Sequence, residues 1–258
     1  MNTPINNQVV LITGAAGRIG SAIAHQLHDQ GASLILNDIS SDLLTEVESS
    51  FNNKRLSSCI AIPMDSTTEE GISSLLQISS GYFPHIHSAV HCAYPRSQTW
   101  GDKIEDLNSS SLFQDLSTQL GGAILFSKLI AKHFLDHGGG NLLHISSIQG
   151  IAAPKFEHYA GTDMHSPIEY SAIKSGVISI TKWLAKYYSD ANIRVNCISP
   201  GGILDGQPHS FLNAYRSSCT NIGMIGADQV AAMALFLLSH TSTAVNGQNF
   251  VVDDGSSL

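Results

Sequence analysis

Charged residues are scarce in this chain of 258 residues: Lys, Arg, Asp and Glu make up 13% of it, and hydrophobic residues make up 43%. Basic residues are the scarcer kind, with 13 Lys and Arg against 21 Asp and Glu, which gives a net charge of −8 at pH 7. Proteins that bind nucleic acid carry a basic stripe, so this composition argues against nucleic acid as a partner. The composition is that of a globular chain and not of a disordered one.

Long hydrophobic runs and paired cysteines are also missing. The longest late apolar run, Ala231 to Leu238, is far shorter than the roughly 20 residues that span a membrane. Residues 1–8 are polar and lack the features of an export signal. The chain has no CxxC pair, and buried reduced thiols are expected of its cysteines, Cys59, Cys92, Cys197 and Cys219. We therefore expect a soluble, cytoplasmic protein with no membrane partner.

Short apolar runs alternate with segments of helical length along the whole chain, without repeats or linkers. The runs are residues 9–12, 33–37, 58–62, 88–92, 141–145, 193–198 and 249–252, and the clearest helices are predicted over about 112–137, 168–188 and 227–238. This alternation is typical of a parallel α/β sheet. We predict one domain over residues 1–258.

The first apolar run ends in a turn with glycines at positions 14, 17 and 20, after which apolar residues recur at helical spacing. Such a strand, glycine turn and helix let the backbone approach a pyrophosphate at the helix N-terminus. The next strand ends in Asp38, which would accept hydrogen bonds from an adenosine ribose and repel a 2′-phosphate. Arg18 argues in the other direction, because a guanidinium tolerates a phosphate. NAD is favoured over NADP.

Tyr170 and Lys174 lie four residues apart, on one face of a predicted helix. A fixed ammonium favours the phenolate form of a nearby tyrosine, which would bring its pKa, ordinarily about 10, towards the range useful for general acid–base catalysis. Taken alone, the pattern also fits a solvated helix face.

The segment Thr13–Gly20 is similar to the Thr-Gly-x-x-x-Gly-x-Gly pattern, and with Tyr170 and Lys174 the chain resembles the short-chain dehydrogenase/reductase family almost end to end. The resemblance implies a single-domain α/β Rossmann fold, with a doubly wound parallel sheet of seven strands and helices on both faces. It also implies hydride transfer between NAD(H) and a secondary alcohol or its ketone. Tyr170 would exchange the proton, Ser147 would bind the substrate oxygen, and Lys174 would hold the nicotinamide ribose.

The same resemblance implies the other site residues. Those for the nucleotide are Gly14, Arg18, Ile19, Gly20, Asp38, Asp65, Ala93, Tyr170, Lys174, Pro200 and Ile203. Asp65 would hold the adenine amino group, although a helix N-cap near Thr68 explains it equally well. Gln119 stands where the family places a proton-relay Asn. Histidines 85, 87 and 91 share a face if they lie in one strand, but nothing completes a metal-ligand set, so no metal is expected.

Two segments near the predicted site depart from a typical family member. The interval between Ser147 and Tyr170 is long, and its insert, about residues 155–166, carries polar groups that suit a polyol or sugar. A solvated loop is the alternative. Tyr159 lies nearer the usual spacing from Ser147, but Asp163 follows it by four residues and would raise its pKa. Residues 206–225 are similar to the substrate lid of the family.

The resemblance extends to assembly and to a subfamily. The outer faces of the helices near 112–137 and 168–188 would form a homodimer or homotetramer. Residues 156–167 and 200–208 are similar to oxidoreductases of flagellin-modification and surface-glycan clusters. Two other functions stay open: an NAD(H)-binding regulatory or scaffolding protein without turnover, and a nucleotide-sugar epimerase or dehydratase. The second is disfavoured because no separate substrate domain follows the seventh strand.

Overall fold

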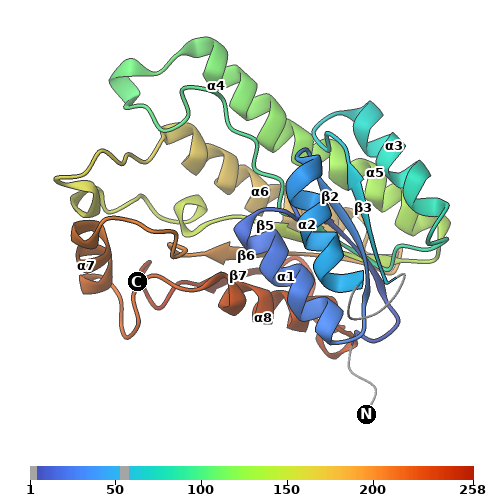
Figure 1. Ribbon diagram of the computed structural model, residues 1–258. Helices are drawn as coiled ribbons and strands as arrows, with labels where there is room; N and C mark the ends of the chain where they lie inside the picture. The colour runs from blue at the N-terminus through green and yellow to red at the C-terminus, as the bar shows by residue number, and fades with distance from the viewer. Residues whose placement is uncertain (1–4, 53–57) are drawn as a thin grey trace.

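The computed structural model describes residues 5–52 and 58–258. Within these residues, seven parallel strands form one sheet in the order β3-β2-β1-β4-β5-β6-β7 (Figure 1). The strands are β1 (Val9–Thr13), β2 (Ser33–Asp38), β3 (Cys59–Pro63), β4 (Ser88–His91), β5 (Gly140–Ile145), β6 (Ile193–Pro200) and β7 (Asn249–Val252). The doubly wound Rossmann sheet predicted from the sequence is confirmed.

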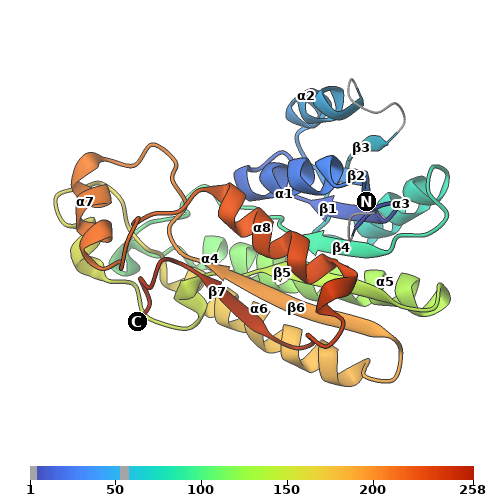
Figure 2. The same cartoon turned by 90° about the horizontal axis from the view of Figure 1, so that it is seen from below.

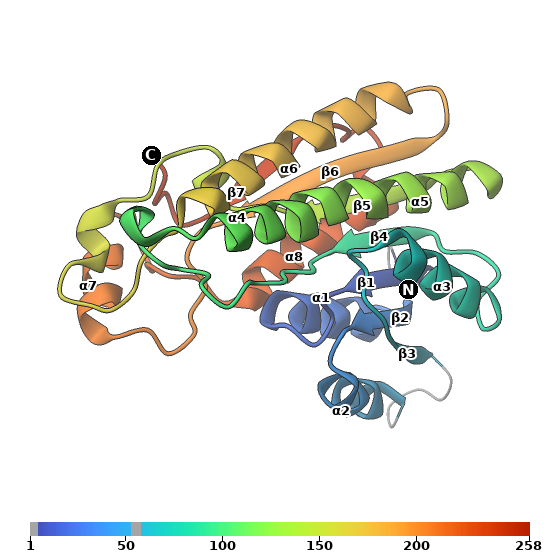
Figure 3. The same ribbon diagram turned by 90° about the horizontal axis from the view of Figure 1, so that it is seen from above.

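Helices cover both faces of the sheet, which explains why its central strands are continuous apolar runs (Figure 3). In β1, Val10 and Ile12 belong to the core under α1 (Arg18–Asp29), α2 (Ser41–Asn52) and α8 (Ala227–Leu238). The alternate residues, Val9 and Leu11, belong to the core under α3 (Glu69–Ser80), α5 (Gly122–Asp136) and α6 (Ile168–Tyr187).

Ligands of open α/β sheets bind at the carboxyl ends of the strands, where the strand order reverses. Here that point lies between β1 and β4, which are neighbours in the sheet. The short helix α7 (His209–Ser217) lies beyond this end of the sheet, beside the insert of residues 155–166 (Figures 1 and 2). The predicted site residues therefore follow strands that converge on one edge.

The prediction of one regular helix over about 112–137 is wrong. It consists of α4 (Ser109–Asp115), a π-helical turn (Leu116–Gly121) and α5. Gly121 and Gly122 weaken the helix at this point, and a Cβ atom on Gly122 would come 3.1 Å from Thr67. In the described part of the chain, no helix combines the length and the apolar character needed to cross a membrane.

Candidate active site

The turn between β1 and α1 brings the backbone close to the space where a ligand would lie. Gly14 has a φ of +64°, and a Cβ atom there would lie 2.7 Å from the carbonyl oxygen of Cys92. A Cβ atom on Gly20 would collide with the carbonyl oxygen of Gly14. No side chain caps the first turn of α1, so its backbone N–H groups remain available to a pyrophosphate. The turn fits a dinucleotide.

A cleft of about 310 Å³ opens at this turn. Of the residues predicted to bind nucleotide, those that line it are Gly14, Arg18, Ile19, Gly20, Tyr170, Lys174 and Ile203. The glycine turn and the tyrosine–lysine pair, more than 150 positions apart in the chain, therefore share one cleft. The predicted residues outside its lining are Asp38, Asp65, Ala93 and Pro200.

Asp38 ends β2 beside the glycine turn. Its carboxylate accepts hydrogen bonds from the backbone N–H groups of Ala16, at 3.1 Å, and Ser40, at 3.3 Å. These contacts hold a negative charge next to the turn.

The three other predicted residues outside the lining have local contacts. Asp65 accepts hydrogen bonds from the backbone N–H and the hydroxyl of Thr67, at 2.9 and 2.7 Å, and Thr68 caps α3. Ala93 donates its N–H to the hydroxyl of Thr13 at 3.3 Å. Pro200 ends β6. Asp65 therefore stabilises the turn before the helix, while the cap that the sequence left open belongs to Thr68.

Arg18 stands at the second glycine position of the Thr-Gly-x-x-x-Gly-x-Gly pattern, and Gly17 precedes it. A side chain is tolerated here because α1 begins at this residue with ordinary helical backbone. The guanidinium pairs with the carboxylate of Asp205, which follows β6, and both side chains are more than half exposed. The pair spans the cleft from the glycine turn to the segment predicted as the lid.

Ser147, Tyr170 and Lys174 come together where β5 ends and α6 begins. The Ser147 side chain lies close enough to the Tyr170 hydroxyl to lower its pKa, and Lys174 donates from Nζ to the carbonyl oxygen of Ile145 at 3.1 Å. The hydroxyl of Ser146 donates to the backbone carbonyl of Lys174 at 2.8 Å, which ties β5 to α6. The spacing of the tyrosine and lysine thus places both on the face of α6 that meets the cleft.

The expected acidification of Tyr170 by Lys174 is wrong for this structure. Burial raises the pKa of the Tyr170 hydroxyl, and only the neighbouring Ser147 side chain acts in the opposite direction. Burial also lowers the pKa of Lys174 to about 8. The physical reason is geometric: the ammonium lies 5.5 Å from the centroid of the Tyr170 ring, over its face, and desolvation outweighs its effect on the hydroxyl.

Gln119 lies in the π-helical turn with its side chain 5% exposed. Within the described residues, neither its amide oxygen nor its amide nitrogen has a hydrogen-bond partner. A buried amide without partners costs about 1–3 kcal/mol, and such groups mark sites of bound water or of function. π-helical turns occur frequently at functional sites. Its relay role stays a prediction.

Three aromatic rings form a cluster at Tyr170 that the sequence pattern did not reveal. The rings of Tyr94, Trp100 and Tyr170 lie edge to face, with centroids 5.5–5.9 Å apart. Tyr94 lines the cleft. Trp100 was missed because a loop tryptophan carries no periodic signal.

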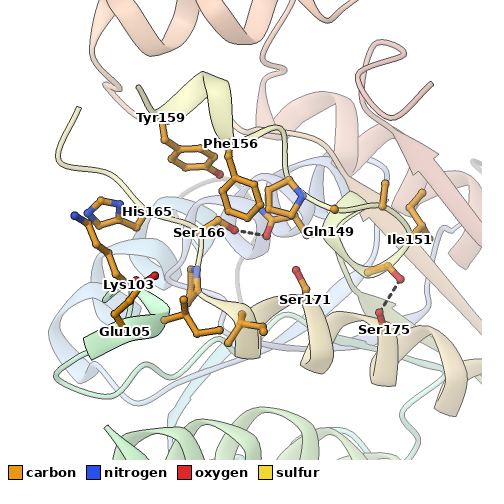
Figure 4. A pocket seen from close by; sticks show the side chains of 17 residues that line it. Lys103, Glu105, Gln149, Ile151, Phe156, Tyr159, His165, Ser166, Ser171 and Ser175 are labelled. Carbon is orange, nitrogen blue, oxygen red and sulfur yellow. Dashed lines mark hydrogen bonds between the residues drawn. The ribbon is translucent and has the colours of Figure 1, made fainter. Parts of the chain in front are cut away.

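A second cavity, of about 700 Å³, lies beside the start of α6 (Figure 4). Ser171 and Ser175 form part of its wall, and Ser175 donates a hydrogen bond to the carbonyl oxygen of Gly150 at 2.9 Å. Ser166 donates to the side-chain oxygen of Gln149 at 2.6 Å. Because Gln149 follows Ser147 by two residues, this cavity begins next to Ser147.

The lining of this cavity is less polar than the insert sequence suggested. Lys103, Glu105 and His165 gather at one end, while Ile151 and Phe156 contribute apolar surface (Figure 4). Other polar groups of the insert point elsewhere, because they bond to the lid segment or to their own loop. A ligand here would meet charges at one end and hydrocarbon along its length.

The insert packs against the segment predicted as the lid. His158 is hydrogen-bonded to the hydroxyl of Ser218 at 2.6 Å, and the rings of Tyr159 and Phe211 are 5.2 Å apart. Residues 220–223 bind the carboxylate of Asp254 through three backbone N–H groups and the Thr220 hydroxyl. The insert and α7 therefore form one small core beyond the sheet.

The histidines of the apparent metal set separate in space. His85 and His87 group with His133 and His137, at ring distances of 4.0–6.2 Å. His91 is buried apart from them, between β1 and α5. Over residues 5–52 and 58–258, no group of three or more His, Cys, Asp or Glu side chains is arranged to hold a metal ion.

The Rossmann sheet, the glycine turn and the Ser–Tyr–Lys group together define an oxidoreductase that uses a nicotinamide dinucleotide. A family model described as enoyl-(acyl carrier protein) reductase matches residues 14–257. The chain belongs to the short-chain dehydrogenase/reductase family.

Similar proteins cover nearly the whole chain. Post-translational flagellin modification protein A of Campylobacter coli is 36% identical over 256 residues, which is 98% of this chain and 100% of that protein. NAD-dependent glycerol dehydrogenase of Listeria innocua is 28% identical and covers 98% of this chain and 95% of its own. The crystal structure of a short-chain dehydrogenase from Leptospira borgpetersenii with bound NAD+ has a TM-score of 0.87 at 27% identity, over 98% of this chain and 94% of that one.

Proposed function

We propose that the protein interconverts a secondary alcohol and its ketone on a small, polar, sugar-like substrate, with NAD(H) as the cofactor. The observation that carries this proposal is the grouping of Ser147, Tyr170 and Lys174 where β5 ends and α6 begins, beside a cleft with a glycine turn. A hydroxyl pair of this kind binds a substrate oxygen and exchanges its proton, while a nicotinamide cofactor supplies or accepts the hydride.

Each residue of the site has a separate role in the proposed reaction. Ser147 fixes the substrate oxygen by a hydrogen bond, and Tyr170 gives a proton to a ketone oxygen or takes one from an alcohol. The raised pKa keeps the Tyr170 hydroxyl protonated, which suits donation to a ketone. Lys174 holds the nicotinamide ribose through its ammonium. Gln119, with both amide atoms free in the described structure, supports a water that returns protons to solvent.

NAD is the preferred cofactor in this proposal. The Asp38 carboxylate, held by two backbone N–H groups, suits ribose hydroxyls and repels a 2′-phosphate. Arg18 is already paired with Asp205, so it is less available to a phosphate. The Listeria innocua relative is named as NAD-dependent, and the Leptospira borgpetersenii structure carries NAD+, which supports the same preference.

The substrate class follows from the cavity beside α6. Its serine and glutamine side chains offer hydrogen bonds to hydroxyl groups, and its apolar wall suits the C–H face of a ring. Relatives named for flagellin modification and for glycerol agree with a polyol or sugar. The insert 155–166 shapes this cavity, and residues 206–225, which bond to the insert through Ser218 and His158, act as the substrate lid.

Assembly as a homodimer or homotetramer belongs to the same proposal. The outer sides of α5 and α6 leave large apolar groups exposed: Ile124 at 48%, Trp183 at 60% and Tyr187 at 66%. A second copy of the chain that packs on these helices would cover them. No disulfide joins the four cysteines, all of which lie in the described residues, and this fits the reducing cytoplasm.

A comparison of two tyrosine variants tests the catalytic assignment. Tyr170→Phe should reduce turnover by at least about 100-fold, because the proton donor is lost, and should leave NADH affinity within a few-fold. Tyr82→Phe makes the same chemical change at an exposed position just after α3 and serves as the control. NADH binding by fluorescence and turnover of alcohols, polyols and sugars would be measured. Normal turnover by the Tyr170 variant would refute the assignment, and NADH binding without any turnover would favour a regulatory role.

A further inference from the structure

Lys174 carries its charge in a place with few partners. The side chain is 8% exposed, and Nζ donates one hydrogen bond, to the carbonyl oxygen of Ile145. Among residues 5–52 and 58–258, no carboxylate forms an ion pair with it. Burial lowers its pKa to about 8, so a small further loss of stabilisation would discharge the ammonium near neutral pH.

The remaining contacts of the ammonium are ring faces. Nζ lies 5.3 Å from the centroid of the Tyr94 ring and 5.5 Å from that of Tyr170. The negative face of an aromatic ring attracts a cation, and the attraction grows where water is excluded. Tyr94 lies three residues after the end of β4 and places its ring at the cleft.

The Tyr94 ring is held from two sides. Trp100 meets it at 89°, with centroids 5.5 Å apart. The loop between the two rings is fixed by the buried carboxylate of Asp115, which accepts from the backbone N–H of Ser97 at 2.8 Å and from its hydroxyl at 2.6 Å. The ring therefore stays beside the ammonium.

Other titratable groups near Lys174 do not replace this contact. They are Cys92 and His91 from the β4 end, His144 from β5 and Cys197 from β6. Burial raises the pKa of both thiols to about 12 and lowers the pKa of His91 to about 3 and of His144 to about 4. All four are neutral at pH 7. Arg96, whose guanidinium carbon is 5.7 Å from the Tyr94 centroid, is itself a cation and offers no compensation.

We infer that Tyr94 is a positioning residue, whose ring face keeps the Lys174 ammonium charged and in place beside the cleft and Tyr170. The inference rests on the proposed function, because Tyr94 acts through Lys174 on the chemistry of Tyr170. The ring face carries the effect, and the hydroxyl does not. Phenylalanine should therefore replace Tyr94, whereas leucine, which has bulk but no ring, should not.

The titration of Lys174 can be measured without turnover. The chain has eight lysines, so ¹³C labelling at the lysine ε-carbon gives a sparse NMR spectrum, and Lys174→Arg assigns the signal of interest. The wild-type signal should titrate near pH 8. Tyr94→Phe should stay within about 0.3 pH units of it, and Tyr94→Leu should titrate about one pH unit lower. Equal titration in the leucine variant and the wild type would overturn the inference.

Two further measurements keep the result interpretable. Thermal unfolding shows whether Tyr94→Leu is folded, and Tyr94→Met is the substitute if it is not. The pH profile of kcat/KM should move in the same direction as the NMR titration, and Tyr94→Phe should restore it. If the wild type turns over no substrate, the proposed function fails while the NMR result still decides the role of Tyr94. If turnover is normal and Lys174 titrates alike in every variant, the role of Tyr94 alone is rejected.

Discussion

Acid should destabilise this protein because two buried imidazoles must stay neutral in the folded state. The ring of His91 stacks on Phe126 with centroids 4.9 Å apart. His144 is fully buried, and its ring nitrogens lie 2.9 Å from the hydroxyl of Ser127 and 2.8 Å from that of Thr181. Burial lowers the pKa of His91 from 6.5 to about 3 and that of His144 to about 4.

The size of the effect follows from these values. Below about pH 6.5 the unfolded chain binds a proton at each imidazole, while the folded protein does not until pH 3–4. Stability therefore falls as the pH drops through this window. A pH of 5 is about 1.5 units below the pKa of each histidine in the unfolded chain, so each histidine lowers the unfolding free energy by about 2 kcal/mol. Two such losses are a large part of a typical unfolding free energy of about 5–15 kcal/mol.

Urea unfolding at pH 7.5 and pH 5.0 measures this loss, and a variant isolates one histidine. His91→Asn removes the imidazole and keeps a neutral polar side chain. Its unfolding free energy should fall by about 2 kcal/mol less than that of the wild type between the two pH values. His209→Asn, at an exposed position of α7, should behave as the wild type does. If His91→Asn lost as much stability as the wild type, the buried imidazole would not be the cause.

Two other predictions concern the cleft and the lid. Asp205→Asn should change stability by less than about 1 kcal/mol, because its pair with Arg18 is exposed, yet it should raise NADPH affinity several-fold relative to NADH by freeing the guanidinium. Titration of both nucleotides measures this, and an unchanged ratio would contradict it. Ser218→Ala should raise the substrate KM about five-fold with a smaller change in kcat, because the lid loses its bond to His158. Ser217→Ala, which loses only a hydrogen bond within α7, is the control. If the Ser218 variant and the wild type had equal KM values, the bond between Ser218 and His158 would not affect substrate binding.

The sequence was informative where function depends on local pattern. The run of Val9 to Ile12 with the glycines behind it predicted a strand, a turn and a helix, and the structure has them at Val9–Thr13 and Arg18–Asp29. The spacing of Tyr170 and Lys174 predicted one helical face, and both line the cleft. Such features depend on neighbouring residues, so periodicity and propensity are enough to find them.

Contacts between distant segments could not be found in this way. Arg18 and Asp205 meet across the cleft, although nothing in either segment indicates the other. Trp100 reaches Tyr170 from a loop whose course depends on the buried bond between Ser97 and Asp115. The direction of the Tyr170 pKa also depended on burial, which sequence spacing does not contain.

The hydrogen bonds to Asp254 restrict how the predicted lid, residues 206–225, can move. Three backbone N–H groups and a hydroxyl of residues 220–223 converge on that one carboxylate, directly after the last strand. The C-terminal end of the predicted lid is therefore fixed beside the last strand. Gly206, at the other end, is exposed and has a φ of +70°. Residues 220–223 are thus fixed, and any movement of the predicted lid has to be taken up by backbone rotation nearer Gly206.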